Sequence, residues 1–239
     1  MNVRLRSLAM LAGLLAAGPA LGNPSGTLFS DTFETGLPKA GWSSNTVTAW
    51  SGVTTWFAGN FSDTTEITLR LPAAPPPETR GSGGGSGGSG GGGSGIPLRL
   101  IYTLRFDLIA IDSWDGFDAR FGPDAFRVSA NDALVFEEHI SNVNTLQTYR
   151  NRQPDVGVWH FYGNPHYGDS IYRQVTIPFE LPIGAPVAIK FHTSPLQGFA
   201  DESWGIDNVN LGYAYVPAPG TAALAGTGAL LCVGRRRRR

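Results

Sequence analysis

The chain has 239 residues, including 32 glycines, with 15% charged and 11% aromatic residues, enough for one sandwich-sized domain with a packed core plus processing segments. Its formal charge of −1 conceals seven arginines in the end segments, Arg4, Arg6 and Arg235 to Arg239. Without these seven, 11 of the 18 Lys and Arg remain against 19 Asp and Glu, a charge of about −8. Because phosphate neutralisation needs clustered Lys and Arg, no nucleic-acid partner is expected.

Residues 1–22 read as a secretory signal, with a basic start, an apolar run and small residues at Ala20 and Gly22. We expect a signal helix that signal peptidase removes after Gly22. A buried helix and a permanent anchor are the alternatives, but the run is short for a membrane span and Gly18-Pro19 interrupts it. The single cysteine, Cys232, lies near the C-terminus, so the exported body depends on its core or on a metal ion instead of disulfides.

Alternating apolar and polar residues dominate the body, residues 23–215. The alternation is clear in four stretches, at residues 66–71, 104–108, 175–181 and 187–192. Such period-2 runs, separated by Gly, Pro, Asn and Asp, predict an all-β fold, an antiparallel β-sandwich.

A Gly/Ser-rich segment at residues 81–95 interrupts the body. Such tracts behave as flexible coil. We expect an expanded surface loop of one sandwich, because the preceding part has too few strands for its own core and loop closure grows only slowly with length. A linker between two domains and an engineered linker are the alternatives.

Acidic residues near both ends of the body suggest a metal site. Asp31 and Glu34 follow the first expected strand, and Asp207 lies in the last one. First and last strands often lie side by side in a sandwich, so these three side chains could supply oxygen ligands to a structural calcium ion. The alternative is that they are solvated strand ends or turn caps.

A second, weaker metal site is expected at Asp112, Asp115 and Asp124, which surround Trp114 in a turn-rich stretch. Several carboxylates so close in sequence repel one another unless a cation or hydrogen bonds compensate. The spacing of an EF-hand loop is absent. Asp and Gly are also ordinary turn residues, which is the competing explanation.

An aromatic segment at residues 158–173 is the candidate ligand site. Aromatic faces beside polar groups suit stacking on sugar rings, and the candidates are Trp159, Tyr162, His166 and Tyr167. The alternative is that alternate aromatic residues belong to the core.

Signals of catalysis are few. The triplet Gly168-Asp169-Ser170 lacks the context of a nucleophile turn, and the four histidines show no metal-ligand spacing. Adjacent acids such as Asp201 and Glu202 point to opposite faces of a strand and so make a poor glycosidase pair. We therefore expect a protein without enzymatic activity, with a glycoside hydrolase or lyase as the alternative.

The C-terminal residues 216–239 resemble a PEP-CTERM sorting signal of the Val-Pro-x-Pro type. Val216, Pro217 and Pro219 match the motif, an apolar segment follows, and Arg235, Arg236, Arg237, Arg238 and Arg239 form the arginine cluster. Ala218 stands where the commonest form has Glu. The resemblance implies cleavage near the Pro motif by an exosortase, a membrane cysteine transpeptidase, in bacteria that make exopolysaccharide.

The physical properties of this tail agree with the resemblance. Its apolar run is shorter than the roughly 20 residues of a comfortable membrane span. The arginines would stop translocation on the cytoplasmic side. We expect a short transmembrane helix that tethers the chain to the membrane only until processing.

The body is similar, more loosely, to jelly-roll domains of the concanavalin-like or MAM-like type. The similarity rests on "DTFETG" and "GW" at the start, "IDSWDG" and "GPDAFRV" in the middle, and "DESWGIDNV" at the end. In such domains an acid near the first strand and an Asp on the last strand hold a structural calcium. The resemblance thus implies calcium at Asp31 or Glu34 and Asp207.

The expected protein is an exported, exosortase-processed cell-surface or extracellular-matrix protein, such as a biofilm matrix component. Its expected role is a non-catalytic module associated with envelope or extracellular polysaccharide. A purely structural matrix protein and a polysaccharide-degrading enzyme on the same fold remain the alternatives.

Overall fold

The computed structural model describes residues 25–49, 55–62, 65–77, 97–143, 146–149, 154–159, 167–198 and 200–218. The predicted signal segment, the Gly/Ser loop and the tail from Pro219 onward lie outside these residues. The chain divides into two compact units, and the unit that contains Ser25–Pro76 and Arg99–Ala214 carries the sandwich. The other unit contains Met1–Pro24, Pro77–Leu98 and Tyr215–Arg239, few of which are described.

The described part of the chain forms eleven strands and no helix. A search for membrane-spanning helices within it accordingly finds none. The strands are β1 Ser25–Asp31, β2 Val47–Ala49, β3 Trp56–Phe61, β4 Ile67–Leu71, β5 Leu98–Asp112, β6 Ala125–Ala130, β7 Ala133–His139, β8 Val156–Trp159, β9 Gly168–Leu181, β10 Val187–Thr193 and β11 Glu202–Pro217.

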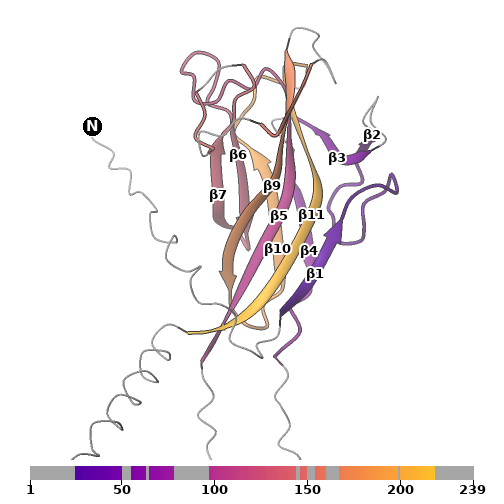
Figure 1. Cartoon of the computed structure of the whole chain (residues 1–239), viewed down its shortest axis with the longest axis vertical. Coiled ribbons are helices and arrows are strands. Elements are labelled where there is room, and N and C mark those ends of the chain that lie inside the picture. The colour runs from indigo at the N-terminus through magenta and orange to yellow at the C-terminus, as the bar shows by residue number, and fades with distance from the viewer. Residues whose placement is uncertain are drawn as a thin grey trace, which may run out of the picture. The chain divides into compact units, whose positions relative to one another are not determined.

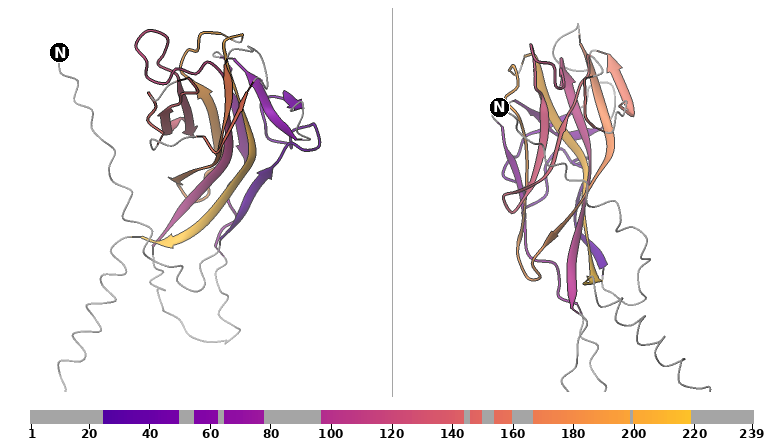
Figure 2. Two further views of the ribbon diagram at one scale, coloured as in Figure 1. Left: turned by 45° about the horizontal axis from the view of Figure 1, so that its top comes forward. Right: turned by 90° about the vertical axis from the view of Figure 1, so that its left-hand side faces the viewer.

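Two antiparallel sheets form a β-sandwich, which confirms the predicted all-β class (Figures 1 and 2). The larger sheet has the order β2-β3-β11-β5-β9-β8, with β1 also paired to β11, and the smaller sheet has the order β4-β10-β6-β7. The long strands β11, β5 and β9 lie side by side in the middle of the larger sheet (Figure 1). The pairing of β1 with β11 confirms that the first and last strands are neighbours.

Aromatic rings join the two sheets. Phe106 of β5 lies 5.9 Å from Phe126 of β6 and 5.3 Å from Phe191 of β10, measured between ring centroids. Trp204 of β11 approaches Phe126 to 5.3 Å. All four side chains are buried. The predicted alternation is realised in β10, where Val187 and the residues two and four further on face the core. The inward faces of both sheets therefore build one core.

One end of the sandwich brings the start of β11 next to two segments that precede it by many residues, the end of β5 and the start of β6. Hydrogen bonds from Ser113 and Trp114 connect the loop after β5 to the start of β11. The Ser113 amide donates to Asp201 O at 3.0 Å, and Trp114 Nε1 donates to Ser203 O at 2.9 Å. Trp114 is fully buried, so apolar packing as well as hydrogen bonding anchors this end of the sandwich.

Replacing Phe126 by Ala tests the role of the inter-sheet aromatic contacts. Phe126 contacts rings of three other strands, so we expect Phe126→Ala to lower the free energy of unfolding by about 3–5 kcal/mol, measured by urea denaturation. Leu134→Ala is the control, because Leu134 on β7 is 55% exposed and should change the midpoint little. Equal effects of the two substitutions would contradict this account of the core.

Candidate metal centre

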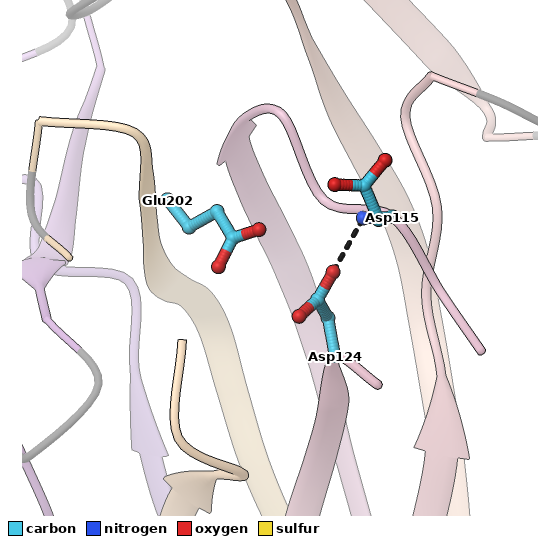
Figure 3. A group of neighbouring side chains, drawn as sticks. All are labelled: Asp115, Asp124 and Glu202. Carbon is cyan, nitrogen blue, oxygen red and sulfur yellow. Dashed lines mark hydrogen bonds between the residues drawn. The ribbon is translucent and has the colours of Figure 1, made fainter. Parts of the chain in front are cut away.

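Three carboxyl groups meet at the end of the sandwich described above. Asp115 comes from the loop after β5, Asp124 immediately precedes β6, and Glu202 is the first residue of β11 (Figure 3). One ligand oxygen of each lies within 4.8 Å of the others. We call these residues the acidic triad. It draws on both sheets, so its geometry depends on the packing of the whole sandwich.

The loop between β5 and β6 is folded so that Asp115 and Asp124 face each other. The Asp124 amide donates to Gly116 O at 2.6 Å, and the Asp115 amide donates to Asp124 Oδ2 at 2.5 Å. Gly116 has a φ of +69°, and a Cβ at this position would lie 1.8 Å from Leu146 O. Only glycine fits here, because any side chain would collide with that carbonyl. The turn chemistry of the loop thus fixes the distance between the two carboxylates.

Glu202 is held from the other side by the segment that leads into β11. The Gln197 amide donates to Glu202 Oε2 at 2.6 Å, and the Glu202 amide donates to Gly198 O at 2.8 Å. Glu202 is completely buried, as are Trp204 and Ile206 two and four residues further on. Its carboxyl is therefore positioned by the strand and by a backbone hydrogen bond.

One oxygen of the triad has no hydrogen-bond partner. Asp124 is 1% exposed, and its buried Oδ1 has no donor while Glu202 is ionised, whereas a protonated Glu202 carboxyl can donate to the Asp124 carboxylate. Figure 3 shows this oxygen turned toward the carboxyl of Glu202. A buried carboxylate oxygen without a donor is costly, because its desolvation is not compensated. Either a proton shared with Glu202 or a cation between the two groups would satisfy it.

The pKa values of the three acids are all raised, which shows that their ionised forms are disfavoured at this site. Burial raises the pKa of Glu202 to about 8; the amide hydrogen bond from Gln197 opposes this shift, and the charges of the neighbouring acids add to it. Burial also raises the pKa of Asp124 to about 6, while hydrogen bonds from the Asp115 and Gly116 amides and with the Glu202 side chain oppose the shift. The pKa of Asp115 is raised by burial and by the charges of Asp118 and Asp201. Three such groups favour the binding of positive charge, as protons or as a metal ion.

The donor set limits which ion fits. The acidic triad offers only carboxylate oxygens, the ligands preferred by hard cations such as calcium and magnesium. The side chains of the acidic triad are close enough to one another to hold a metal ion.

The first predicted calcium ligand, Asp31, is a turn anchor in the structure. It is 2% exposed, and its Oδ1 accepts from the Phe33 amide at 3.0 Å. Its Oδ2 accepts from the Lys39 amide at 2.8 Å and from Trp42 Nε1 at 3.1 Å. These bonds agree with the alternative explanation that Asp31 caps a turn.

The other two predicted ligands of that site have different surroundings. Glu34 Oε1 accepts from Thr55 Oγ1 at 2.5 Å. Asp207 is 8% exposed and accepts from the Asn208 amide at 2.6 Å. Burial and then the charges of three nearby acids, with Asp107 the largest, raise the pKa of Asp207 to about 7. Asp31, Glu34 and Asp207 are not a group with ligand oxygens within 4.8 Å, although all three are described. Calcium binding there stays a prediction.

The second predicted site is partly assembled. Asp115 and Asp124 are brought together, whereas Asp112 is not in the group. Asp112 is buried at the end of β5, where its amide donates to Asp169 Oδ1 at 2.9 Å. Its place in the triad is taken by Glu202.

Sequence reasoning missed Glu202 because Asp201 and Glu202 were considered only as a catalytic pair. In the structure the six consecutive residues from Glu202 to Asp207 are all buried. Alternation therefore does not distinguish Glu202 from its neighbours, and its burial follows from the packing of β11 in the sandwich.

The remaining predicted residues fall largely outside the described part. For the aromatic site, Trp159 is described only as the last residue of β8, Tyr162 and His166 lie outside, and Tyr167 is half-buried just before β9. For the processing motif, Val216 and Pro217 are the last residues of β11, whereas Pro219 and the arginine cluster lie outside. Sugar binding and processing stay predictions.

Comparisons with known proteins add little. No protein-family model matches the chain, and no curated protein does. Among solved structures, the chain is similar to the crystal structure of dimeric latent PorU from Porphyromonas gingivalis, with 11% sequence identity and a TM-score of 0.44. The similarity covers 85% of this chain and 14% of that one.

The substitution Asp207→Asn tests the raised pKa of that carboxyl. The folded protein binds this proton more tightly than the unfolded chain, so the stability it contributes is present below about pH 4 and lost as the pH rises through about 7. We expect the wild type to lose stability relative to Asp207→Asn between pH 4 and pH 8, measured by urea unfolding in chelator. Asp132→Asn, in the exposed turn before β7, is the control. A constant difference between wild type and Asp207→Asn would show that the pKa is not raised.

Proposed function

We propose that this protein is an exported, non-catalytic jelly-roll module that binds calcium at the acidic triad and associates with envelope or extracellular polysaccharide. The observation that carries the proposal is the buried Asp124 Oδ1, which is turned toward Glu202 and has no donor while Glu202 is ionised. A calcium ion bound by all three carboxylates supplies the missing partner and the missing positive charge.

Calcium suits the triad better than magnesium. The three carboxylates come from separate segments and are spaced by up to 4.8 Å, with one of them half-buried. Calcium accepts six to eight oxygens in irregular geometry, whereas magnesium demands a compact octahedron. The bound ion would hold the loop after β5, the start of β6 and the start of β11 together. In an exported body without a cysteine, this would replace the stabilisation that secreted domains often take from disulfides.

The burial of Asp124 and Glu202 supports a binding role over catalysis. Both are at most 1% exposed, and their carboxyl oxygens lie within 4.8 Å of each other. A glycosidase pair must be open to the sugar that lies between its two groups. The close, enclosed arrangement fits ion ligands.

Export and processing are proposed from the two end segments of the sequence. Signal peptidase would remove residues 1–22, and the C-terminal segment would tether the chain transiently to the inner membrane. An exosortase would then cut near Val216-Pro217, which releases the body to the cell surface or the extracellular matrix. The acidic body is consistent with a protein that has no nucleic-acid partner.

Calcium should stabilise the protein if the triad binds it. For the chelator-treated wild type we expect calcium at 100-fold above its dissociation constant to raise the melting temperature by about 5–10 °C, measured by calorimetry. The double variant Asp124→Asn, Glu202→Gln should lose this rise. The rise should persist in Asp118→Asn, which removes an acid from the same loop outside the triad, and in Asp207→Asn.

The same experiment separates the two candidate calcium sites. A rise that is lost in Asp207→Asn and kept in the double variant would assign calcium to Asp31, Glu34 and Asp207. A wild type that does not respond to calcium would overturn calcium binding altogether.

Intact mass of the exported protein tests the proposed processing. In cells with an active exosortase we expect a mass that lacks both residues 1–22 and the residues after the Pro motif. Cells without the exosortase should keep the tail, and changing Pro217 and Pro219 to Ala should have the same effect. An exported protein that retains its arginine cluster in both strains would contradict the proposal.

A further inference from the structure

The side-chain amide of Gln197 lies against the acidic triad. Its nitrogen, Nε2, is 3.4 Å from Asp115 Oδ2, 3.4 Å from Glu202 Oε1 and 2.5 Å from Phe121 O. Asp115 and Phe121 belong to the loop between β5 and β6, and Glu202 is the first residue of β11. One nitrogen is thus surrounded by two carboxylate oxygens of the triad and one backbone carbonyl oxygen.

The three contacts of this nitrogen differ in quality. Its distance to Phe121 O is short, whereas both distances to the carboxylates exceed the roughly 2.7–3.2 Å of ordinary N–H···O hydrogen bonds. The amide group is also neutral, so its N–H groups compensate two carboxylates only weakly. The amide nitrogen therefore lies where the triad needs positive charge, but it supplies little of that charge.

The same oxygens suit a calcium ion. Calcium binds carboxylate and backbone carbonyl oxygens at roughly 2.3–2.6 Å. Phe121 O is already 2.5 Å from Gln197 Nε2, and the carboxylates of Asp115 and Glu202 would have to approach that point by roughly 1 Å. A carbonyl oxygen also adds a ligand without adding negative charge, which matters because three carboxylates already exceed the charge of a divalent ion.

The side chain of Gln197 can turn away from this position. Gln197 is an exposed residue, so its amide can be hydrated once it leaves the triad. The hydrogen bond that positions Glu202 comes from the Gln197 backbone, whose amide donates to Glu202 Oε2 at 2.6 Å. A movement of the Gln197 side chain therefore leaves Glu202 in place.

From this arrangement we infer that the side-chain nitrogen of Gln197 takes the place of the calcium ion in the calcium-free protein. The entering ion displaces this amide and gains Phe121 O as a further ligand beside the acidic triad. The inference rests on the proposed calcium site and assigns it a residue that sets its affinity. The contacts of Gln197 Nε2 must break before calcium can enter, so they compete with the ion.

Substitutions of Gln197 test the competition, by isothermal titration of calcium into chelator-treated protein. Gln197→Ala removes the competing amide and should bind calcium about tenfold more tightly than the wild type. Gln197→Lys brings a full positive charge to the same oxygens. It should bind calcium at least about 100-fold more weakly, and should melt at a higher temperature than the wild type in chelator.

Ile183→Lys is the matched control for the added charge. Ile183 is 49% exposed in the turn between β9 and β10. The substitution adds an ammonium group away from the triad, so both the calcium affinity and the melting temperature in chelator should stay close to those of the wild type.

Carbon-13 NMR of protein labelled at the phenylalanine carbonyls tests the role of Phe121. Calcium should shift the Phe121 carbonyl signal, identified by its loss in Phe121→Leu, and leave the signal of Phe136 on β7 unchanged. A Phe121 signal that does not move in the calcium-bound protein would overturn its role as a ligand.

The calorimetry distinguishes failure of the inference from failure of the calcium site. If the wild type binds calcium and Gln197→Ala binds it no more tightly, the inference is wrong and the calcium site stands. Weaker binding by Gln197→Ala would likewise overturn the inference, because the side chain would then be a ligand through its own oxygen. Calcium binding by Gln197→Lys at the affinity of the wild type would have the same consequence. Absence of calcium binding by the wild type would overturn the proposed function and the inference with it.

Discussion

The compensation of three buried carboxyl groups is the constraint on which this end of the sandwich depends. Asp115, Asp124 and Glu202 are brought within 4.8 Å by segments from both sheets, and one oxygen of Asp124 has no donor. Such a group is stable only with added positive charge. The hydrogen bonds that join Ser113 to Asp201 and Trp114 to Ser203 keep the groups together despite their repulsion. A calcium ion would neutralise the repulsion between the carboxylates and link the two sheets.

Three of the motifs noted in the sequence meet at one site in the fold. "IDSWDG" and "GPDAF" belong to one loop and "DESWGIDN" lies about 80 residues further on, but each contributes one acid to the triad, and the first motif donates hydrogen bonds to the third. Gly116 is required because a side chain would collide with Leu146 O. In contrast, both carboxylate oxygens of Asp31, the acid of "DTFETG", accept hydrogen bonds from the residues that follow it in the chain. Similar Asp-rich motifs thus play two different roles here.

The strands could be predicted from the sequence because alternation is a local property. It located β4, β10 and the regular parts of β5 and β9, and the neighbourhood of β1 and β11 followed from a general rule of sandwiches. The triad could be predicted only in part. Asp115 and Asp124 are nine residues apart in one loop, whereas Glu202 reaches them through the pairing of β11 beside β5. Which of several acids meet is decided by strand register and by bulges, such as the one between Phe106 and Leu108, and these are long-range properties.

The most direct test of the central claim is a crystal structure of the body grown with calcium, with anomalous difference density to locate the ion. We predict a peak between Asp115, Asp124 and Glu202, at a distance of about 2.3–2.6 Å from Asp124 Oδ1, with further oxygen ligands on the side of Asp115. A well-ordered triad in which Glu202 donates a proton to Asp124 Oδ1, without anomalous density between the carboxyl groups, would contradict the account.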